Sequence, residues 1–338
     1  MTTLMGFGNR TALLLPLPTE LPPAAVRVGD RLARLTEDVG AHYTVAMGID
    51  GPAAAARKEL LAWVETHGER GRPVDAEPPN GSCIHDRFFA VRRARGDSAA
   101  LLAAALLTSD LLVRDDLARN GSTLEEDADN LLLGVTPYLT ATVAPPAKHV
   151  RWRPTDPGAA AEERWLVGHQ RFFVMLQLLV IAMRELGDAG TTHQEHERVR
   201  SFGWLCRSTA VSMRYAADFP PDLYGPVRDT MTPPTVNAGF SGLQTRDHHE
   251  LVNCMRQSKR DGVFDRLAPS SLAAVHAAMQ HLYDAHGWVC ARFGGATEPS
   301  LLMAQTGQES AVTPESGLAA AERLSRQRLR HLDTTQTD

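Results

Sequence analysis

The longest apolar run in the chain extends over twelve residues, from Phe172 to Met183, and it constrains the fold more than any other segment. Arg171 and Arg184 bound this run, and Gln177 interrupts it. Because a membrane-spanning helix needs about 20 apolar residues, the run predicts a helix buried in the core of a soluble protein. The rest of the chain must then supply the helices that cover it.

Helix start and stop signals recur along most of the chain, whereas we find no β-alternation of useful length and no internal repeat. Apolar periodicity, proline pairs and glycine stops therefore predict an all-α fold. Two helical regions, 1–150 and 151–338, are expected to form one compact domain. The predicted helices are 30–40, 52–67, 98–117, one that follows a capping box starting at Ser122, 159–186, 193–217, 241–261, 270–293 with Ser270 as its cap, and 315–331.

Charge and cysteine usage exclude several classes of protein. The formal net charge of −5 gives no basic footprint for nucleic acid. Cys83, Cys206, Cys254 and Cys290 lack CxxC spacing, which argues against a disulfide framework and against a zinc site built from the four thiolates. The N-terminus has no basic region ahead of its short leucine run, so we expect no signal peptide, no membrane partner and a cytoplasmic location.

The expected helix 270–293 places a histidine and a cysteine one turn apart on an apolar face. His286 lies within the apolar stripe, and Cys290 follows it at i+4, about 6 Å along the helix axis. An imidazole at this position could bind a haem iron while the thiol adds to a peripheral vinyl group as a single thioether. The spacing also fits a core histidine beside an unrelated buried cysteine. The stripe consists of Leu272, Val275, Met279, Leu282, His286, Val289 and Phe293, while His276 and His281 fall off it and are expected at the surface.

Three segments resemble the tryptophan 2,3-dioxygenase family. The run His286-Gly-Trp-Val-Cys290-Ala-Arg292-Phe-Gly-Gly295 is similar to that family's proximal helix, in which the residue four after the axial histidine is valine. Arg228-Asp229, Pro234 and the run from Gly239 to Arg246 resemble its substrate segment, with a few extra residues. Ile84-His85-Asp-Arg-Phe-Phe89 looks like its distal-histidine helix. The family's glycine- and serine-rich loop is replaced by Gly294–Ser300, which argues against cleavage of an indole ring.

Cysteine four residues after the axial histidine resembles instead a branch of haem-dependent tyrosine hydroxylases, above all the 3-methyl-L-tyrosine hydroxylases of saframycin-type antibiotic pathways. Their motif has an upstream histidine, which Asp247-His248-His249-Glu250 supplies here. The resemblance implies His286 as the proximal iron ligand, Cys290 as the thioether donor and His248 as a second histidine facing the iron, with His249 as the alternate. Only one of these two neighbours can face the iron, because adjacent helical residues point about 100° apart. Resting bis-histidine ligation would require one histidine to leave during turnover.

The resemblance also assigns roles around the haem. His85 is expected to be a distal acid/base for a bound peroxide or phenol, although a plain histidine at a helix start is an equal alternative. Arg228 matches an arginine that clamps the substrate carboxylate, and Arg292 is expected among the cofactor contacts. Region 1–150 would supply the distal side, and region 151–338 would bind the haem.

The function implied is hydroxylation of a tyrosine derivative ortho to its hydroxyl, from 3-methyl-L-tyrosine to 3-hydroxy-5-methyl-L-tyrosine, in biosynthesis of a tetrahydroisoquinoline antibiotic. The chain has no flavin or nicotinamide motif, so hydrogen peroxide is the expected oxidant, with oxygen plus an external reductant as the alternative. An indole dioxygenase and a non-enzymatic bis-histidine haem protein for electron transfer or sensing are the rival interpretations. A homo-oligomer is left open.

Overall fold

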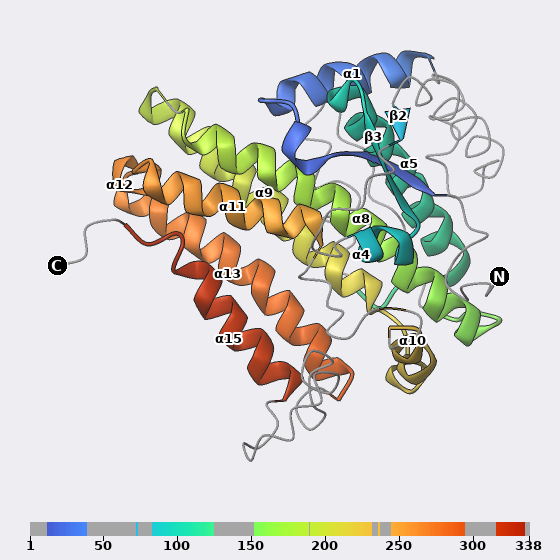
Figure 1. Ribbon diagram of the computed structural model, residues 1–338. Coiled ribbons are helices and arrows are strands. Elements are labelled where there is room, and N and C mark those ends of the chain that lie inside the picture. The colour runs from blue at the N-terminus through green and yellow to red at the C-terminus, as the bar shows by residue number, and fades with distance from the viewer. Residues whose placement is uncertain are drawn as a thin grey trace.

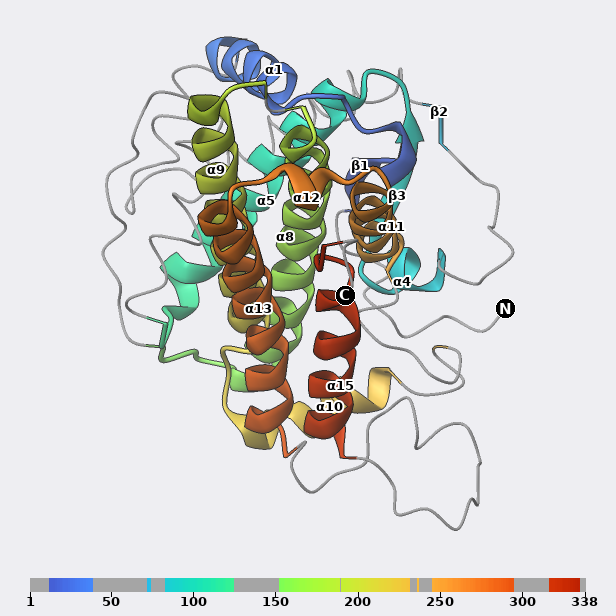
Figure 2. The same cartoon turned by 90° about the vertical axis from the view of Figure 1, so that its left-hand side faces the viewer.

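The computed structural model describes residues 12–38, 72–73, 83–124, 152–188, 190–231, 236, 245–294 and 316–334. Within these ranges the chain is overwhelmingly helical, which confirms the all-α prediction. Figures 1 and 2 show long helices lying side by side, with a small sheet near one end. The longer helices are α1 (Ala25–Asp38), α5 (Ser98–Asn120), α8 (Pro157–Leu186), α9 (Thr192–Ala216), α11 (Arg246–Arg260), α13 (Pro269–Arg292) and α15 (Gly317–Leu329).

Helix α8 is the central element, as the apolar run predicts. It packs against α5, α9 and α11, and its side chains from Phe172 to Met183 are buried. By length and composition alone α8 could cross a membrane, but 94% of its most apolar window is buried inside the protein. This is the arrangement of the core helix of a soluble protein. Where α8 meets α9, Gly168 allows the close approach, because a Cβ on it would lie 2.4 Å from the Cα of Ala216.

Capping residues explain most helix starts. Asp156, Thr191 and Ser316 accept hydrogen bonds from backbone N–H groups in the first turns of α8, α9 and α15. The prediction that Ser270 caps α13 is wrong. Proline occupies the first helical position, where its missing N–H costs nothing, so α13 begins one residue earlier, at Pro269.

Other predicted boundaries shift by a few residues. Helix α1 covers 25–38 rather than 30–40, and α11 begins at Arg246, after the cap Thr245, rather than at residue 241. Gly262, with a positive φ of 63°, follows the end of α11 as expected. The helix predicted at 52–67 and the one after Ser122 lie outside the described residues. Short elements complete the list: η1 (Pro18–Glu20), α4 (Cys83–Phe88), η2 (Pro221–Leu223), α10 (Tyr224–Thr230) and α12 (Val263–Arg266).

A small sheet is present although no strand was predicted. Its order is β1-β3-β2, where β1 (Leu13–Pro16) pairs parallel with β3 (Val91–Arg95), and β2 (Arg72–Pro73) pairs antiparallel with β3. The strands are short, and the alternation in β3 is hidden because the inward-facing residues include Arg93. A buried arginine in a strand looks like a solvent-facing residue in the sequence.

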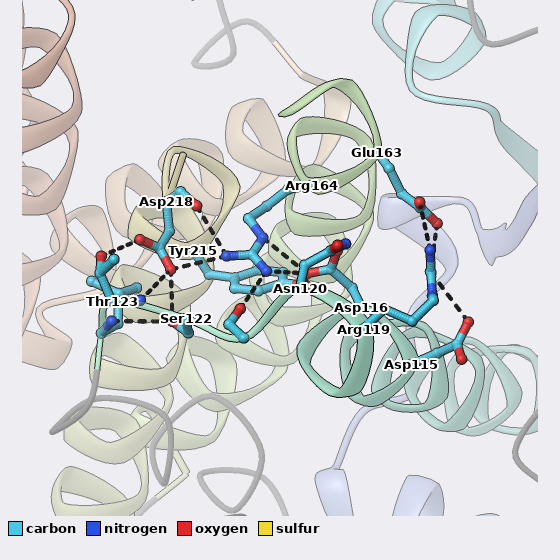
Figure 3. Close-up of polar contacts among 12 residues, drawn as sticks. Asp115, Asp116, Arg119, Asn120, Ser122, Thr123, Glu163, Arg164, Tyr215 and Asp218 are labelled. Carbon is cyan, nitrogen blue, oxygen red and sulfur yellow. Dashed lines mark hydrogen bonds and ion pairs between the residues drawn. The ribbon is translucent and has the colours of Figure 1, made fainter. Parts of the chain in front are cut away.

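A buried ionic cluster joins α5, α8 and the end of α9. The Arg164 side chain is fully buried between Asp116, at 2.7 Å, and Asp218, at 3.0 Å (Figure 3). Arg164 also donates to the carbonyls of Gly121 (2.5 Å) and Asp218 (2.9 Å). Tyr215 donates its hydroxyl to Asp116. The cluster fixes the chain segment that follows α9, against which the end of α13 packs.

Candidate active site

Helix α13 brings His286 and Cys290 together as the i, i+4 spacing predicts. The Cys290 Sγ lies 4.0 Å from the His286 Nε2, and both side chains are half-buried. Val275, Met279 and Leu282, earlier on the same stripe, are buried in the core. The C-terminal half of the stripe, which carries the imidazole and the thiol, therefore lies outside the close-packed core. Of the two histidines expected at the surface, His276 and His281, both are half-buried.

Burial makes both side chains electrically neutral at physiological pH. It lowers the pKa of His286 to about 4 and raises the pKa of the Cys290 thiol to about 11. A neutral imidazole has a free lone pair, which is the form that binds a metal. The thiol beside it is protonated at this pH and is therefore not a metal-binding thiolate. These two side chains fit a cofactor whose central metal accepts one nitrogen ligand from the protein and whose periphery is apolar.

Stacked aromatic rings hold the end of α13. The ring of Phe293 stacks on Tyr224, with centroids 4.0 Å apart and planes 8° apart, and on Phe219 at 5.1 Å. The Arg292 guanidinium donates to the carbonyls of Ala217 (3.1 Å) and Phe219 (3.0 Å). These contacts fix the helix turn that carries Cys290 to the segment after α9. A cofactor contact for Arg292 stays a prediction.

Arg228 lies at the same end of the site. It is half-buried on α10, and its positive charge acts on Tyr224, one turn earlier. Burial raises the pKa of Tyr224 to about 12, with Arg228 lowering it and Cys290 raising it further. The structure therefore brings Arg228, Tyr224 and Cys290 within electrostatic range of one another. The role of Arg228 toward a substrate carboxylate stays a prediction.

The structure distinguishes between the two neighbouring histidines of α11. His248 is buried, with 2% of its surface exposed, whereas His249 is exposed. The His248 Nε2 lies 3.5 Å from the Tyr283 hydroxyl, and the two rings meet edge to face. Tyr283 precedes His286 by three residues, so the two share one face of α13. His248 therefore approaches α13 one turn before His286, and His249 points elsewhere.

His85 is buried, with 4% exposed, on the short helix α4. It lies close enough to His169 of α8 to affect its charge: burial, with a smaller contribution from His85, lowers the pKa of His169 to about 4. The His169 ring stacks on Phe89 at 4.2 Å, and its Nδ1 lies 2.6 Å from the Trp165 carbonyl oxygen. Sequence reasoning missed His169, because a histidine in a buried helix has no spacing signal that separates it from the core.

Comparison with known proteins places the chain in a family. The crystal structure of reduced SfmD, obtained by soaking with sodium hydrosulfite, shares its fold: the TM-score is 0.57 at 24% identity, covering 82% of this chain and 96% of that one. The model of the SfmD 3-methyl-L-tyrosine peroxygenase family matches residues 14–270. A 3-methyl-L-tyrosine peroxygenase of Streptomyces lavendulae is 30% identical over 257 residues, which cover 71% of this chain and 70% of that protein.

The chain is thus a helical oxidoreductase of the peroxygenase type. It belongs to the SfmD 3-methyl-L-tyrosine peroxygenase family, which confirms the resemblance drawn from the motifs. The matched range of the family model contains His85, Arg228 and His248, and it ends before His286 and Cys290. The geometry of α13 is therefore evidence that is independent of the family match.

Proposed function

We propose that this protein is a haem-dependent peroxygenase that hydroxylates 3-methyl-L-tyrosine to 3-hydroxy-5-methyl-L-tyrosine with hydrogen peroxide. The reaction inserts one oxygen atom into a ring C–H bond and releases water. Family membership supports the class of reaction. The observation that carries the cofactor assignment is the 4.0 Å separation of the Cys290 Sγ and the His286 Nε2 on a half-buried, apolar helix face.

Haem fits the residues of this site. His286 would bind the iron through its neutral imidazole, and Cys290 would bind the porphyrin edge as a single thioether. When bound, the haem supplies the oxidising chemistry that no side chain can provide. His248 would be the second histidine that holds the haem iron, because it is the buried member of its pair and reaches the face of α13 that carries His286.

The remaining residues would orient the substrate and handle protons. Arg228 would bind the carboxylate of the amino acid, as a bidentate guanidinium pair commonly does. His85, which is buried on α4, would hold or transfer the proton of the peroxide or of the phenol. Arg292 would contact the cofactor while keeping its hydrogen bonds to the Ala217 and Phe219 carbonyls, which hold the end of α13. We place the enzyme in the cytoplasm, in the biosynthesis of a tetrahydroisoquinoline antibiotic.

Denaturing extraction followed by intact-mass measurement tests the tether. We expect the wild-type polypeptide to retain one haem after denaturation in acidic organic solvent, and Cys290→Ser to release it. Cys254→Ser is the matched control, because Cys254 is a buried cysteine on α11 whose Sγ contacts Glu250 instead. Haem that is extracted freely from the wild-type protein would refute the tether.

Product mass tests the reaction. Incubation of the haem-loaded enzyme with 3-methyl-L-tyrosine and peroxide is expected to add one oxygen atom to the substrate. Addition of two oxygen atoms would favour an indole-dioxygenase type of chemistry. Complete haem loading without turnover of any tyrosine would favour a role in electron transfer or sensing.

A further inference from the structure

Arg93 of β3 lies at the centre of a buried cluster of hydrogen bonds and ion pairs. Its Nε and Nη2 donate to the two oxygens of Asp86, at 3.0 and 2.6 Å. Its Nη1 and Nη2 donate to the two oxygens of Asp247, at 2.9 and 2.6 Å. The Nη1 also reaches the Pro16 carbonyl of β1 at 3.3 Å. All five N–H donors of the guanidinium thus have an acceptor.

The two carboxylates are the immediate chain neighbours of the two candidate distal histidines. Asp86 follows His85 on α4, and Asp247 precedes His248 on α11. One planar guanidinium therefore joins the two short stretches of backbone from which these imidazoles extend. The two aspartates lie 161 positions apart in the chain, so no local interaction could set their spacing.

Further contacts tie both carboxylates to the rest of the protein. Asp247 accepts a hydrogen bond from Gln177 of α8 at 2.9 Å. Asp86 pairs with Arg246 at 3.3 Å. The cluster is balanced in charge, with two arginines and two aspartates. Because the side chains of Arg93, Asp86 and Asp247 are almost fully buried, movement of either helix would expose an unpaired charge to an apolar interior.

We propose that Arg93 is a positioning residue that fixes His85 and His248 relative to each other. A planar five-donor fork holds two carboxylates in one plane, which a lysine with three rotatable donors cannot do. The functional consequence rests on the proposed function, because it assumes that these histidines serve a haem site. The structural part of the proposal does not depend on haem.

The test compares Arg93→Lys with Arg164→Lys. Arg164 is the matched control, since it is equally buried and also bridges two buried aspartates, but neither of its carboxylates is adjacent to a histidine (Figure 3). The first measurement is made without haem, by ¹⁵N-labelling the histidine side chains and recording their imidazole signals. We expect Arg93→Lys to shift the signals of His85 and His248, and Arg164→Lys to leave both in place. Unchanged signals in Arg93→Lys would overturn the proposal.

The second measurement uses the haem-loaded protein. The absorption spectrum reports the ratio of histidine-ligated to water-ligated iron, with His248→Ala as the reference for a lost second ligand. We expect Arg93→Lys to lower this ratio by about tenfold or more, since displacement of a positioned group by about 1 Å can cost up to about 100-fold. A ratio equal to that of Arg164→Lys would overturn the functional part of the proposal. If His248→Ala itself has the wild-type spectrum, the ligand role in the proposed function fails, while the imidazole signals still decide the role of Arg93.

Isosteric variants keep the test decisive should Arg93→Lys fail to fold. Asp247→Asn weakens only the connection to α11, and Asp86→Asn weakens only the connection to α4. We expect Asp247→Asn to alter the signal of His248 and the axial-ligand spectrum. Asp86→Asn is expected to alter the signal of His85 and the pH profile of turnover, with a smaller effect on the spectrum. Identical effects of the two variants on both histidines would contradict separate positioning through one arginine.

Discussion

His169 gives a quantitative prediction for the acid stability of the haem-free protein. Its pKa is lowered from 6.5 to about 4 in the folded state, chiefly by burial. Between pH 6.5 and 4, His169 therefore binds a proton in the unfolded chain but not in the folded chain. Because the unfolded state binds more protons in this window, the free energy of unfolding rises with pH across it and falls as the solution is acidified.

The size of the effect follows from the two pKa values. Relative to pH 7.5, His169 alone removes about 2 kcal/mol of stability at pH 5, and about 3 kcal/mol once the pH is well below 4. His286, whose pKa is also lowered to about 4, adds a similar loss. The pair thus contributes about 4 kcal/mol at pH 5, which is a large fraction of the stability of a typical domain.

The assay is urea unfolding of haem-free protein at several pH values, compared with His169→Asn. The asparagine amide can replace the Nδ1 donor toward the Trp165 carbonyl, which lies 2.6 Å from the imidazole, but it does not titrate. We expect the variant to lose about one proton from the pH dependence of unfolding and to keep the contribution of His286. Equal pH dependence in the variant and the wild type would show that His169 titrates normally in the folded protein, and the argument from burial would be wrong.

Three further predictions use other contacts. Arg164→Met should cost about 3–5 kcal/mol of stability, because it leaves two buried aspartates unpaired; chemical denaturation measures it, and a loss below that of a typical surface substitution would contradict it. Arg228→Gln should raise the KM for the amino acid by about tenfold or more with a smaller change in kcat, since a charge-assisted hydrogen bond contributes about 1.5–3 kcal/mol; steady-state kinetics would refute it by an unchanged KM. Tyr283→Phe should cost about 1 kcal/mol or less, because it removes one long contact to His248; a larger loss in urea unfolding would indicate a stronger network than the geometry implies.

Much of the helical architecture could be predicted because its determinants are local. The apolar run of α8 and the polar caps Asp156 and Thr191 lie within one or two turns of the features that they control. The small sheet could not be predicted in this way. Arg93 occupies a buried strand position only because two aspartates from distant segments neutralise it. Its burial is thus a property of the folded chain.

In the candidate site, too, the features set by local spacing could be predicted and those set by tertiary contacts could not. His286 and Cys290 are one helical turn apart, so their proximity was already contained in the spacing, and the structure confirms it with a separation of 4.0 Å. His248 was placed ahead of His249 through the family resemblance alone, whereas the burial of His248 and the exposure of His249 depend on how α11 packs against α13, which no spacing supplies. His169 had no signal at all, since its significance comes from stacking on Phe89 and from its burial beside His85.

This division implies that the two sides of the site respond differently to substitution. The side on α13 is held by rings and by hydrogen bonds from Arg292 to two carbonyls, so a lost contact there weakens packing gradually. On the side with His85 and His248, the Arg93 guanidinium lies between two buried carboxylates, and its removal would leave the Asp247 carboxylate without an arginine partner. We therefore expect substitutions near α13 to alter affinity for the cofactor in small steps. Substitution of Arg93 should change the positions of His85 and His248 together, whereas substitution of Asp86 or Asp247 should act mainly on the histidine beside it.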